Sequence, residues 1–186
     1  MIFVTVGTQK FQMNRLMNAV ENLAVEMPEE KIVVQYGNST LDMPHCEMHQ
    51  FLDRAEFEKY ISCCDILITH GGVGTVMQGL KLKKKVIVVP RLKDYDEHVD
   101  DHQLEASRAL RNNKCVIVCM NVEYLGFIVK NIDNYLFGEF IEPKARIEDI
   151  VENYIETGTA EGTDSYGGNT NGTFRPLEKL FQAKKL

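Results

Sequence analysis

The sequence predicts a doubly wound α/β domain, in which helices cover both faces of a parallel β-sheet. Three observations support this class. Short runs of β-branched and apolar residues alternate with segments of helical periodicity between residues 2 and 119. The runs 65–69 and 86–89 are almost continuously apolar, as in strands buried on both faces. Strands separated by helices are joined by right-handed crossovers and therefore lie parallel in one sheet.

Each element follows from its local pattern. Helix 13–27 repeats Leu16, Val20 and Leu23 at helical spacing, and Asp53 is expected to cap the next helix. The expected strands are 2–6, 31–35, a weak one at 46–49, 65–69, 86–89 and 115–119; the expected helices are 13–27, 53–62, 73–82 and 101–111. This order is Rossmann-like. Ligands in such sheets bind beyond the carboxyl ends of the strands, so the loops after Val6, Thr69 and Val89 are the expected site.

A chain of 186 residues is long enough for one domain with a core that needs no disulfides. We expect that domain to span residues 1–156. Residues 157–173 are rich in Gly, Thr and Asn and poor in apolar residues, which predicts a flexible segment. Residues 174–186 then resume helical spacing, which predicts a C-terminal helix.

Composition excludes several classes of protein. The net charge of −6 and pI near 5.4 argue against bulk affinity for nucleic acid or anionic lipid. No apolar run approaches the ~20 residues of a membrane span, and the first residues read as a strand rather than a signal peptide. An odd number of cysteines, five, favours reduced thiols in a cytoplasm. We therefore expect a cytoplasmic location.

The segment His70-Gly71-Gly72-Val73-Gly74-Thr75 carries the strongest functional signal. A buried strand enters a glycine-rich turn that opens a helix, where glycines permit close approach and free N–H groups attract phosphate. The dinucleotide pattern G-x-G-x-x-G fails at Met77, and the Walker pattern fails at Leu80, where lysine is required. A tight turn that binds nothing is the alternative interpretation.

Two further segments follow strands and face the same edge of the predicted sheet. Arg91 begins a polar segment that can meet phosphate and donate to sugar hydroxyls; a solvated acidic loop is the alternative interpretation of this segment. Gly7 and Thr8 follow the first strand and can form a second anion contact.

The polar segment also contains metal-ligating residue types. Asp94 and Asp96 form a D-x-D, and His98 and His102 are four residues apart. The histidine pair lacks the glutamate of H-E-x-x-H, however, and D-x-D is too short to be specific. We therefore predict no metal and no cofactor.

The motifs, taken in order, resemble the glycosyltransferase family 28 C-terminal domain, part of the GT-B fold. They are V-T-V-G-T near the start, F-L-D before a helix, D-I-L-I-T-H-G-G-V-G-T, and V-I-V-V-P-R followed by E-H-V-D-D-H-Q. The resemblance extends over residues 1–125 or so, and it is strongest to free-standing subunits of bacterial exopolysaccharide and capsule assembly. These are similar to the catalytic subunit of the two-part UDP-GlcNAc transferase of the dolichol pathway.

The resemblance implies a role for each matched residue. The glycine turn would hold a diphosphate, with the first-strand loop on its other side, and Leu52 would offer its backbone to uracil. Asp101 and Gln103 would lie near the donor sugar and phosphates. Gln78 stands where the family usually has a ribose-binding glutamate. The implied diphosphate residues are Gly7, Thr8, Gly71, Gly72, Gly74 and Thr75, and Arg91 is expected beside them from its position after a strand.

The implied activity is transfer of a sugar from a UDP-sugar donor to a lipid-linked saccharide, in polysaccharide biosynthesis. A membrane-associated Rossmann-like partner would supply the acceptor side and bring the chain to the inner face of the membrane. Nucleic acid is not an expected ligand. His70 and His98 are the catalytic candidates, and a structural histidine is an equally good interpretation of each. The alternatives are a non-catalytic nucleotide-sugar-binding or enhancer subunit, and a metal-dependent enzyme.

Overall fold

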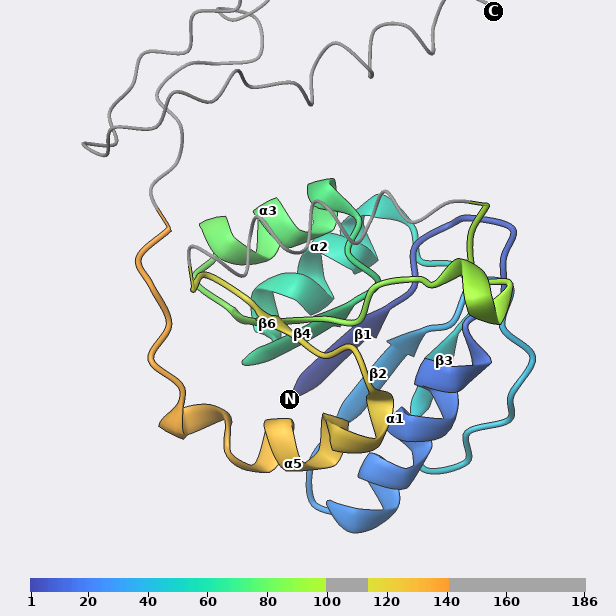
Figure 1. The fold of residues 1–186 in the computed structure, drawn as a ribbon, viewed down its shortest axis with the longest axis horizontal. Helices are drawn as coiled ribbons and strands as arrows, with labels where there is room; N and C mark the ends of the chain where they lie inside the picture. Colours follow the sequence, from blue (N-terminus) through green and yellow to red (C-terminus); the bar gives the residue numbers. More distant parts are fainter. Residues whose placement is uncertain (100–113, 141–186) are drawn as a thin grey trace, which may run out of the picture. The chain divides into compact units, whose positions relative to one another are not determined.

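Parallel strands form the centre of the domain in the computed structural model, which describes residues 1–99 and 114–140. Within these residues six strands pair in the order β3-β2-β1-β4-β5-β6 (Figure 1). Their bounds are Ile2–Thr5 for β1, Ile32–Gln35 for β2, Glu47–His49 for β3, Ile66–Thr69 for β4, Lys85–Val88 for β5 and Ile117–Val118 for β6. Every pairing is parallel, which confirms the predicted fold class.

The helices confirm the predicted alternation. The main ones are α1 (Asn14–Glu26), α2 (Arg54–Cys63), α3 (Val73–Lys81) and α5 (Leu125–Lys130), with short 3₁₀ turns η1 (Lys93–Tyr95), η2 (Val122–Tyr124) and η3 (Ile132–Asn134). The Asp53 carboxylate accepts from the Glu56 amide at 2.8 Å, as expected of the α2 cap. Helix α5 was not predicted, because six residues are too few to display helical periodicity.

Some sequence expectations lie outside the described residues. These are the helix at 101–111, the flexible segment at 157–173 and the C-terminal helix at 174–186. The strand expected at 115–119 pairs over Ile117–Val118 alone, since its ladder meets β5 only at Ile87 and Val88.

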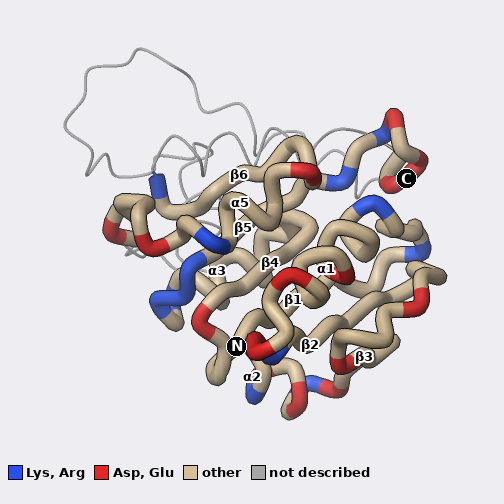
Figure 2. The backbone as a smooth tube through the Cα atoms, turned by 90° about the horizontal axis from the view of Figure 1, so that it is seen from below, with Lys and Arg blue, Asp and Glu red and all other residues tan. Residues whose placement is uncertain are grey.

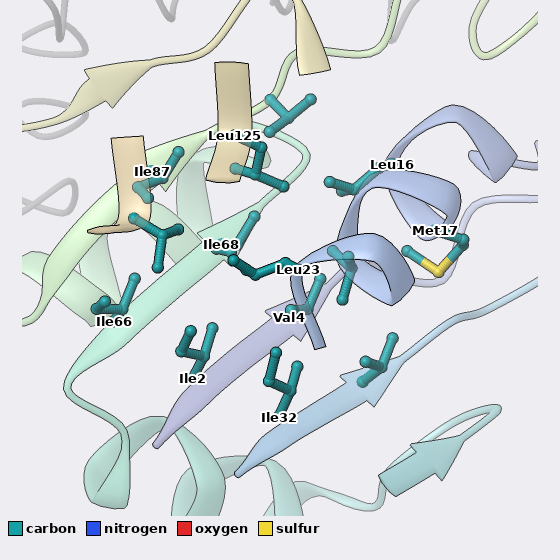
Figure 3. Packing of buried hydrophobic residues seen from close by; sticks show 14 of the residues in the cluster. Ile2, Val4, Leu16, Met17, Leu23, Ile32, Ile66, Ile68, Ile87 and Leu125 are labelled. Carbon is teal, nitrogen blue, oxygen red and sulfur yellow. The ribbon is translucent and has the colours of Figure 1, made fainter. Parts of the chain in front are cut away.

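The core forms two layers, one on each face of the sheet. Side chains alternate along a strand, so Ile2 and Val4 pack with α1 and α5, whereas Phe3 packs with α2 and α3. In Figure 1, α2 and α3 lie above the sheet and α1 and α5 below it. Figure 3 shows Leu16 and Leu23 of α1 packed over the strands. The helical stripe predicted for residues 13–27 is therefore the stripe that covers this face.

Charged residues lie outside this core. Strands β1, β2 and β4 contain no charged residue, and Lys, Arg, Asp and Glu lie on the segments around them (Figure 2). In the described part of the chain, no helix is both long enough and apolar enough to cross a membrane. The layers thus leave the ends of the strands, rather than the faces of the sheet, open to a polar ligand.

Candidate functional site: a cleft at the carboxyl ends of β1 and β4

A cleft lies where the strand order reverses. The chain runs outward from β1 through β2 to β3, and then from β4 through β5 to β6 on the other side, so the reversal falls between β1 and β4. Crossovers leave this point in opposite directions and open a crevice at the carboxyl ends of the strands. The cleft here has a volume of about 440 Å³ and is lined by residues from 5–9, 35, 52–57 and 70–75.

Buried polar side chains mark the floor of the cleft. Thr5 pairs in register with Gln35 on one side and with Thr69 on the other, and His70 follows Thr69. All four residues are buried, although burial of polar groups costs free energy unless they find partners. A polar row at the carboxyl ends of the otherwise apolar strands β1, β2 and β4 indicates a site that receives a polar ligand.

The amino end of α3 forms one wall. Its N-cap is Gly72, whose carbonyl accepts a hydrogen bond from the Val76 amide at 3.1 Å. The amides of Val73, Gly74 and Thr75 precede that bond, and these residues line the cleft. Unpaired amides and the helix dipole together attract an anion at such an end.

His70 lies between two glycines. A Cβ on Gly7 would lie 2.7 Å from His70 Cε1, and a Cβ on Gly72 would lie 2.8 Å from His70 Nε2. Gly7 also has φ +72°, a conformation that other residues rarely adopt. These two glycines are therefore required by the imidazole ring itself, before any ligand is considered.

Burial and, to a smaller extent, the positive charge of Arg91 together lower the pKa of His70 to about 4. A neutral imidazole is the form present at pH 7. It can donate one hydrogen bond and accept another, but such a low pKa makes it a weak general base.

The opposite wall comes from the loop after β1 and the start of α2. Gln35 Nε2 donates to the Gly7 carbonyl at 3.4 Å, and Asn38 Nδ2 donates to the Gln9 carbonyl at 2.9 Å. Leu52 and Phe57 add apolar surface beside Asp53 and Arg54. Sequence reasoning missed Gln35 and Phe57, because each becomes a neighbour of the glycine turn only through the order of the strands and the packing of α2.

The structure brings together most of the predicted site. Gly7, Thr8, Leu52, His70, Gly72, Gly74 and Thr75 all line the cleft. Gly71 is buried behind it with φ +91°, and Gln78 lies one helical turn further along α3. His98 instead packs near Phe11, with ring centroids 5.8 Å apart. Asp101 and Gln103 lie outside the described residues.

Arg91 occupies a different place from the one expected. Its side chain is fully buried, and it does not line the cleft. Its guanidinium donates to the backbone carbonyls of Val6 at 2.7 Å, Phe11 at 3.1 Å and Glu97 at 3.2 Å. Both terminal nitrogens of the guanidinium donate to the protein backbone, so a direct contact between Arg91 and phosphate has no support in this geometry.

Metal-ligating side chains do not gather in the described part of the chain. Within residues 1–99 and 114–140, no three His, Cys, Asp or Glu side chains are placed to share an ion. Asp94 and Asp96 are both exposed on and beside η1. Among the described residues, the metal-dependent alternative therefore has no group of side chains that could bind the metal ion.

Comparison with known proteins places this geometry in a family. Two curated relatives, both named UDP-N-acetylglucosamine transferase subunit ALG13, come from Candida albicans (33% identical over 89 residues) and Yarrowia lipolytica (30% identical over 98 residues). The matches cover 47% and 52% of this chain, but only 28% and 46% of those proteins.

A solved structure of the glycotransferase of kitacinnamycin has the same fold as the domain, with a TM-score of 0.54 at 16% identity, covering 70% of this chain and 34% of that one. Residues 1–133 match the glycosyltransferase family 28 C-terminal domain, and they include every segment that lines the cleft. The match extends over more than half of the sequence, and the chain belongs to this glycosyltransferase family.

Proposed function

We propose that the chain is the donor-binding part of a GT-B glycosyltransferase, which binds a UDP-sugar in the cleft between β1 and β4. The observation that carries this proposal is the meeting of two anion-binding elements at one point. The amino end of α3 and the glycine loop after β1 both line the cleft, from opposite sides. A diphosphate between them would receive backbone amides from α3 without any bound cation.

The two ends of the cleft suit the two ends of the donor. Leu52 and Phe57 supply apolar surface for a nucleobase, and the Leu52 backbone is the proposed partner of the uracil edge. Gln78, further along α3, is the proposed partner of the ribose hydroxyls. Asp101 and Gln103 are assigned to the donor sugar by family resemblance alone.

In the proposed reaction an acceptor hydroxyl attacks the anomeric carbon of the donor sugar. The bond from that carbon to the UDP oxygen breaks, and UDP leaves with the electron pair. The first amides of α3 stabilise the charge that develops on the leaving diphosphate. The proton of the acceptor hydroxyl passes to a general base, for which His70 and His98 are the candidates within the described residues.

A partner subunit completes this proposal. Both curated relatives are named as subunits, and the matched part of each is less than half of its length. We infer that a membrane-associated Rossmann-like partner supplies the acceptor side, and that the acceptor is a lipid-linked saccharide of capsule or exopolysaccharide synthesis. The chain would then act in the cytoplasm, at the inner face of the membrane.

A non-catalytic subunit that binds the nucleotide sugar is the second candidate. One observation favours it: Asp53 is the single carboxylate among the described lining residues, and it caps α2. His70, with its pKa lowered to about 4, is a poor base. A chain without its own base would deliver or retain the donor for a catalytic partner.

Two measurements test both candidates, and a pair of histidine variants separates them. Calorimetry of the purified chain with UDP should show binding, and absence of binding would refute both candidates. Transfer from a panel of UDP-sugars to a lipid-linked acceptor should then require co-expression with a membrane-associated Rossmann-like partner. Full turnover by the chain alone would overturn the need for a partner. Turnover that survives His70→Gln and His98→Gln in the complex would favour the non-catalytic role.

A further inference from the structure

Arg91 lies beneath the loop that connects β1 to α1, here called the β1 loop (residues 6–12). Its Nη2 donates to the Val6 carbonyl at 2.7 Å, and its Nη1 donates to the carbonyls of Phe11 at 3.1 Å and Gln12 at 3.4 Å. Val6 begins the loop, and Phe11 and Gln12 end it. One guanidinium therefore bonds both ends of the segment whose middle, residues 7–9, lines the cleft.

The residues around Arg91 are themselves held in place. Arg91 Nη1 also donates to the Glu97 carbonyl at 3.2 Å. The Glu97 carboxylate, 2% exposed, binds Arg15 of α1 through two nitrogens, at 2.8 and 3.2 Å, and accepts from the Leu92 amide at 3.1 Å. Arg15 donates in addition to the Pro90 carbonyl at 3.0 Å. The loop that carries Arg91 is thus bonded to α1. Because this loop is held in place, the rigid guanidinium of Arg91 can hold a second loop in one conformation.

A guanidinium is an expensive group to bury here. Burial lowers the pKa of Arg91, the charge of Glu97 offsets this only in part, and Nε has no hydrogen-bond partner among the described residues. An apolar side chain of similar volume would fill the same space without a desolvation cost. What an apolar side chain cannot do is bond several carbonyls that converge from two loops.

The orientation of those carbonyls matters to an anion. The carbonyls of Gly7 and Gln9 accept from Gln35 and Asn38, and those of Val6, Phe11 and Gln12 accept from Arg91. A carbonyl oxygen that accepts a hydrogen bond from a protein donor stays directed at that donor. It is therefore kept from turning toward a bound diphosphate, whose negative charge it would repel. Without Arg91, three of these five oxygens lose that constraint.

We propose that Arg91 is a positioning residue for the donor site, which bonds both ends of the β1 loop and so holds residues 7–9 in the conformation that receives the diphosphate. This inference rests on the proposed function for the identity of the ligand. The conformational part of it is independent of any ligand. Arg91 acts without touching the nucleotide, in contrast to the direct phosphate contact expected from sequence.

The test compares Arg91→Met and Arg91→Lys with a destabilising control in the core. Ile132 in η3 is 3% exposed, does not line the cleft and makes none of the side-chain hydrogen bonds that hold the β1 loop, so Ile132→Ala lowers stability while it leaves those bonds in place. We expect Arg91→Met to weaken UDP binding on the order of tenfold, because the loop must now be ordered by the ligand. Arg91→Lys, whose ammonium cannot span both ends of the loop, should show a smaller loss, and Ile132→Ala should bind like the wild type.

Amide hydrogen exchange supplies the readout that needs no ligand. In Arg91→Met, exchange should accelerate in residues 6–12 more than in β4 or α1, whereas Ile132→Ala should leave that segment as protected as in the wild type. Unchanged UDP affinity and unchanged exchange in both Arg91 variants would overturn the inference while leaving the proposed function intact. If wild-type protein binds no UDP, the proposed function fails, and exchange in the β1 loop alone decides the role of Arg91.

Discussion

Gly74 offers a substitution whose effects on folding and on binding have opposite signs. It is the second residue of α3 and lines the cleft. A Cβ at this position would meet no atom of the described protein within 4 Å, and its φ is not in the left-handed region. A side chain added here therefore extends into the cleft without meeting another described residue.

The expected changes in stability and in UDP affinity follow from this position. Replacement of glycine by alanine stabilises a helix interior by roughly 0.5–1 kcal/mol, since the unfolded chain loses conformational freedom, and the gain is smaller in the first turn, where Gly74 lies. Binding should weaken, because the added carbon keeps the diphosphate from the α3 amides. A lost hydrogen bond to a charged group costs about 1.5–3 kcal/mol. We expect Gly74→Val to reduce UDP affinity by at least ~1.5 kcal/mol, more than tenfold, and Gly74→Ala to cause a smaller loss.

The assay is calorimetric titration with UDP alongside thermal unfolding of each variant without ligand. Gly72→Ala is the informative comparison, because its Cβ would lie 2.8 Å from His70 Nε2 and must displace the imidazole. That variant should lose both stability and affinity, whereas Gly74→Ala should gain stability and lose affinity. Unchanged UDP affinity in a well-folded Gly74→Val variant would falsify the placement of the diphosphate against α3.

Three further outcomes are expected. Folding lowers the pKa of His70 from 6.5 to about 4, so the unfolded state binds more protons between these values and stability falls as the pH falls. By linkage this loss of stability amounts to about 3 kcal/mol. Urea unfolding at pH 6.5 and pH 4 should show that the His70→Gln variant loses much less stability than the wild type over this range. Parallel pH profiles of the two proteins would contradict the buried neutral imidazole. Gln78→Glu should keep or improve UDP affinity, because a carboxylate makes a charge-assisted bond to ribose hydroxyls, and a large loss by calorimetry would give Gln78 another role. Transfer by the reconstituted complex should survive EDTA, since backbone amides rather than a cation are proposed to meet the leaving UDP; abolition by EDTA, restored by a divalent cation, would favour the metal-dependent alternative.

Local sequence patterns were sufficient to predict the elements whose structure depends on consecutive residues of one segment. Apolar runs predicted the strands, the periodicity of residues 13–27 predicted α1, and Asp53 caps α2 as expected. The glycine turn could be recognised because its chemistry is local: a strand end, a turn and a helix start occupy consecutive residues. Helix α5 escaped prediction because its identity comes from packing against α1, through residues such as Leu125 and Ile128.

The composition of the cleft is only partly local. Gln35 reaches it because β2 pairs with β1 and places this residue in register with Thr5, and Phe57 reaches it from α2. No spacing in the sequence specifies either neighbour, since strand order depends on the global packing of helices on both faces. The family resemblance supplied Leu52 and the matched glycines, but it gave no signal for these two residues.

By itself, then, the sequence determined a parallel α/β domain, its glycine turn and the edge of the sheet where a ligand would bind. Those properties depend on hydrophobic periodicity and on the conformational freedom of glycine, which act over a few residues. The tertiary structure alone decided the place of Arg91. From its position after a strand it was expected to face phosphate, yet it is buried among carbonyls of the β1 loop and of Glu97. A guanidinium bonds whichever acceptors converge on it, and convergence of two loops is a property of the folded chain rather than of either segment.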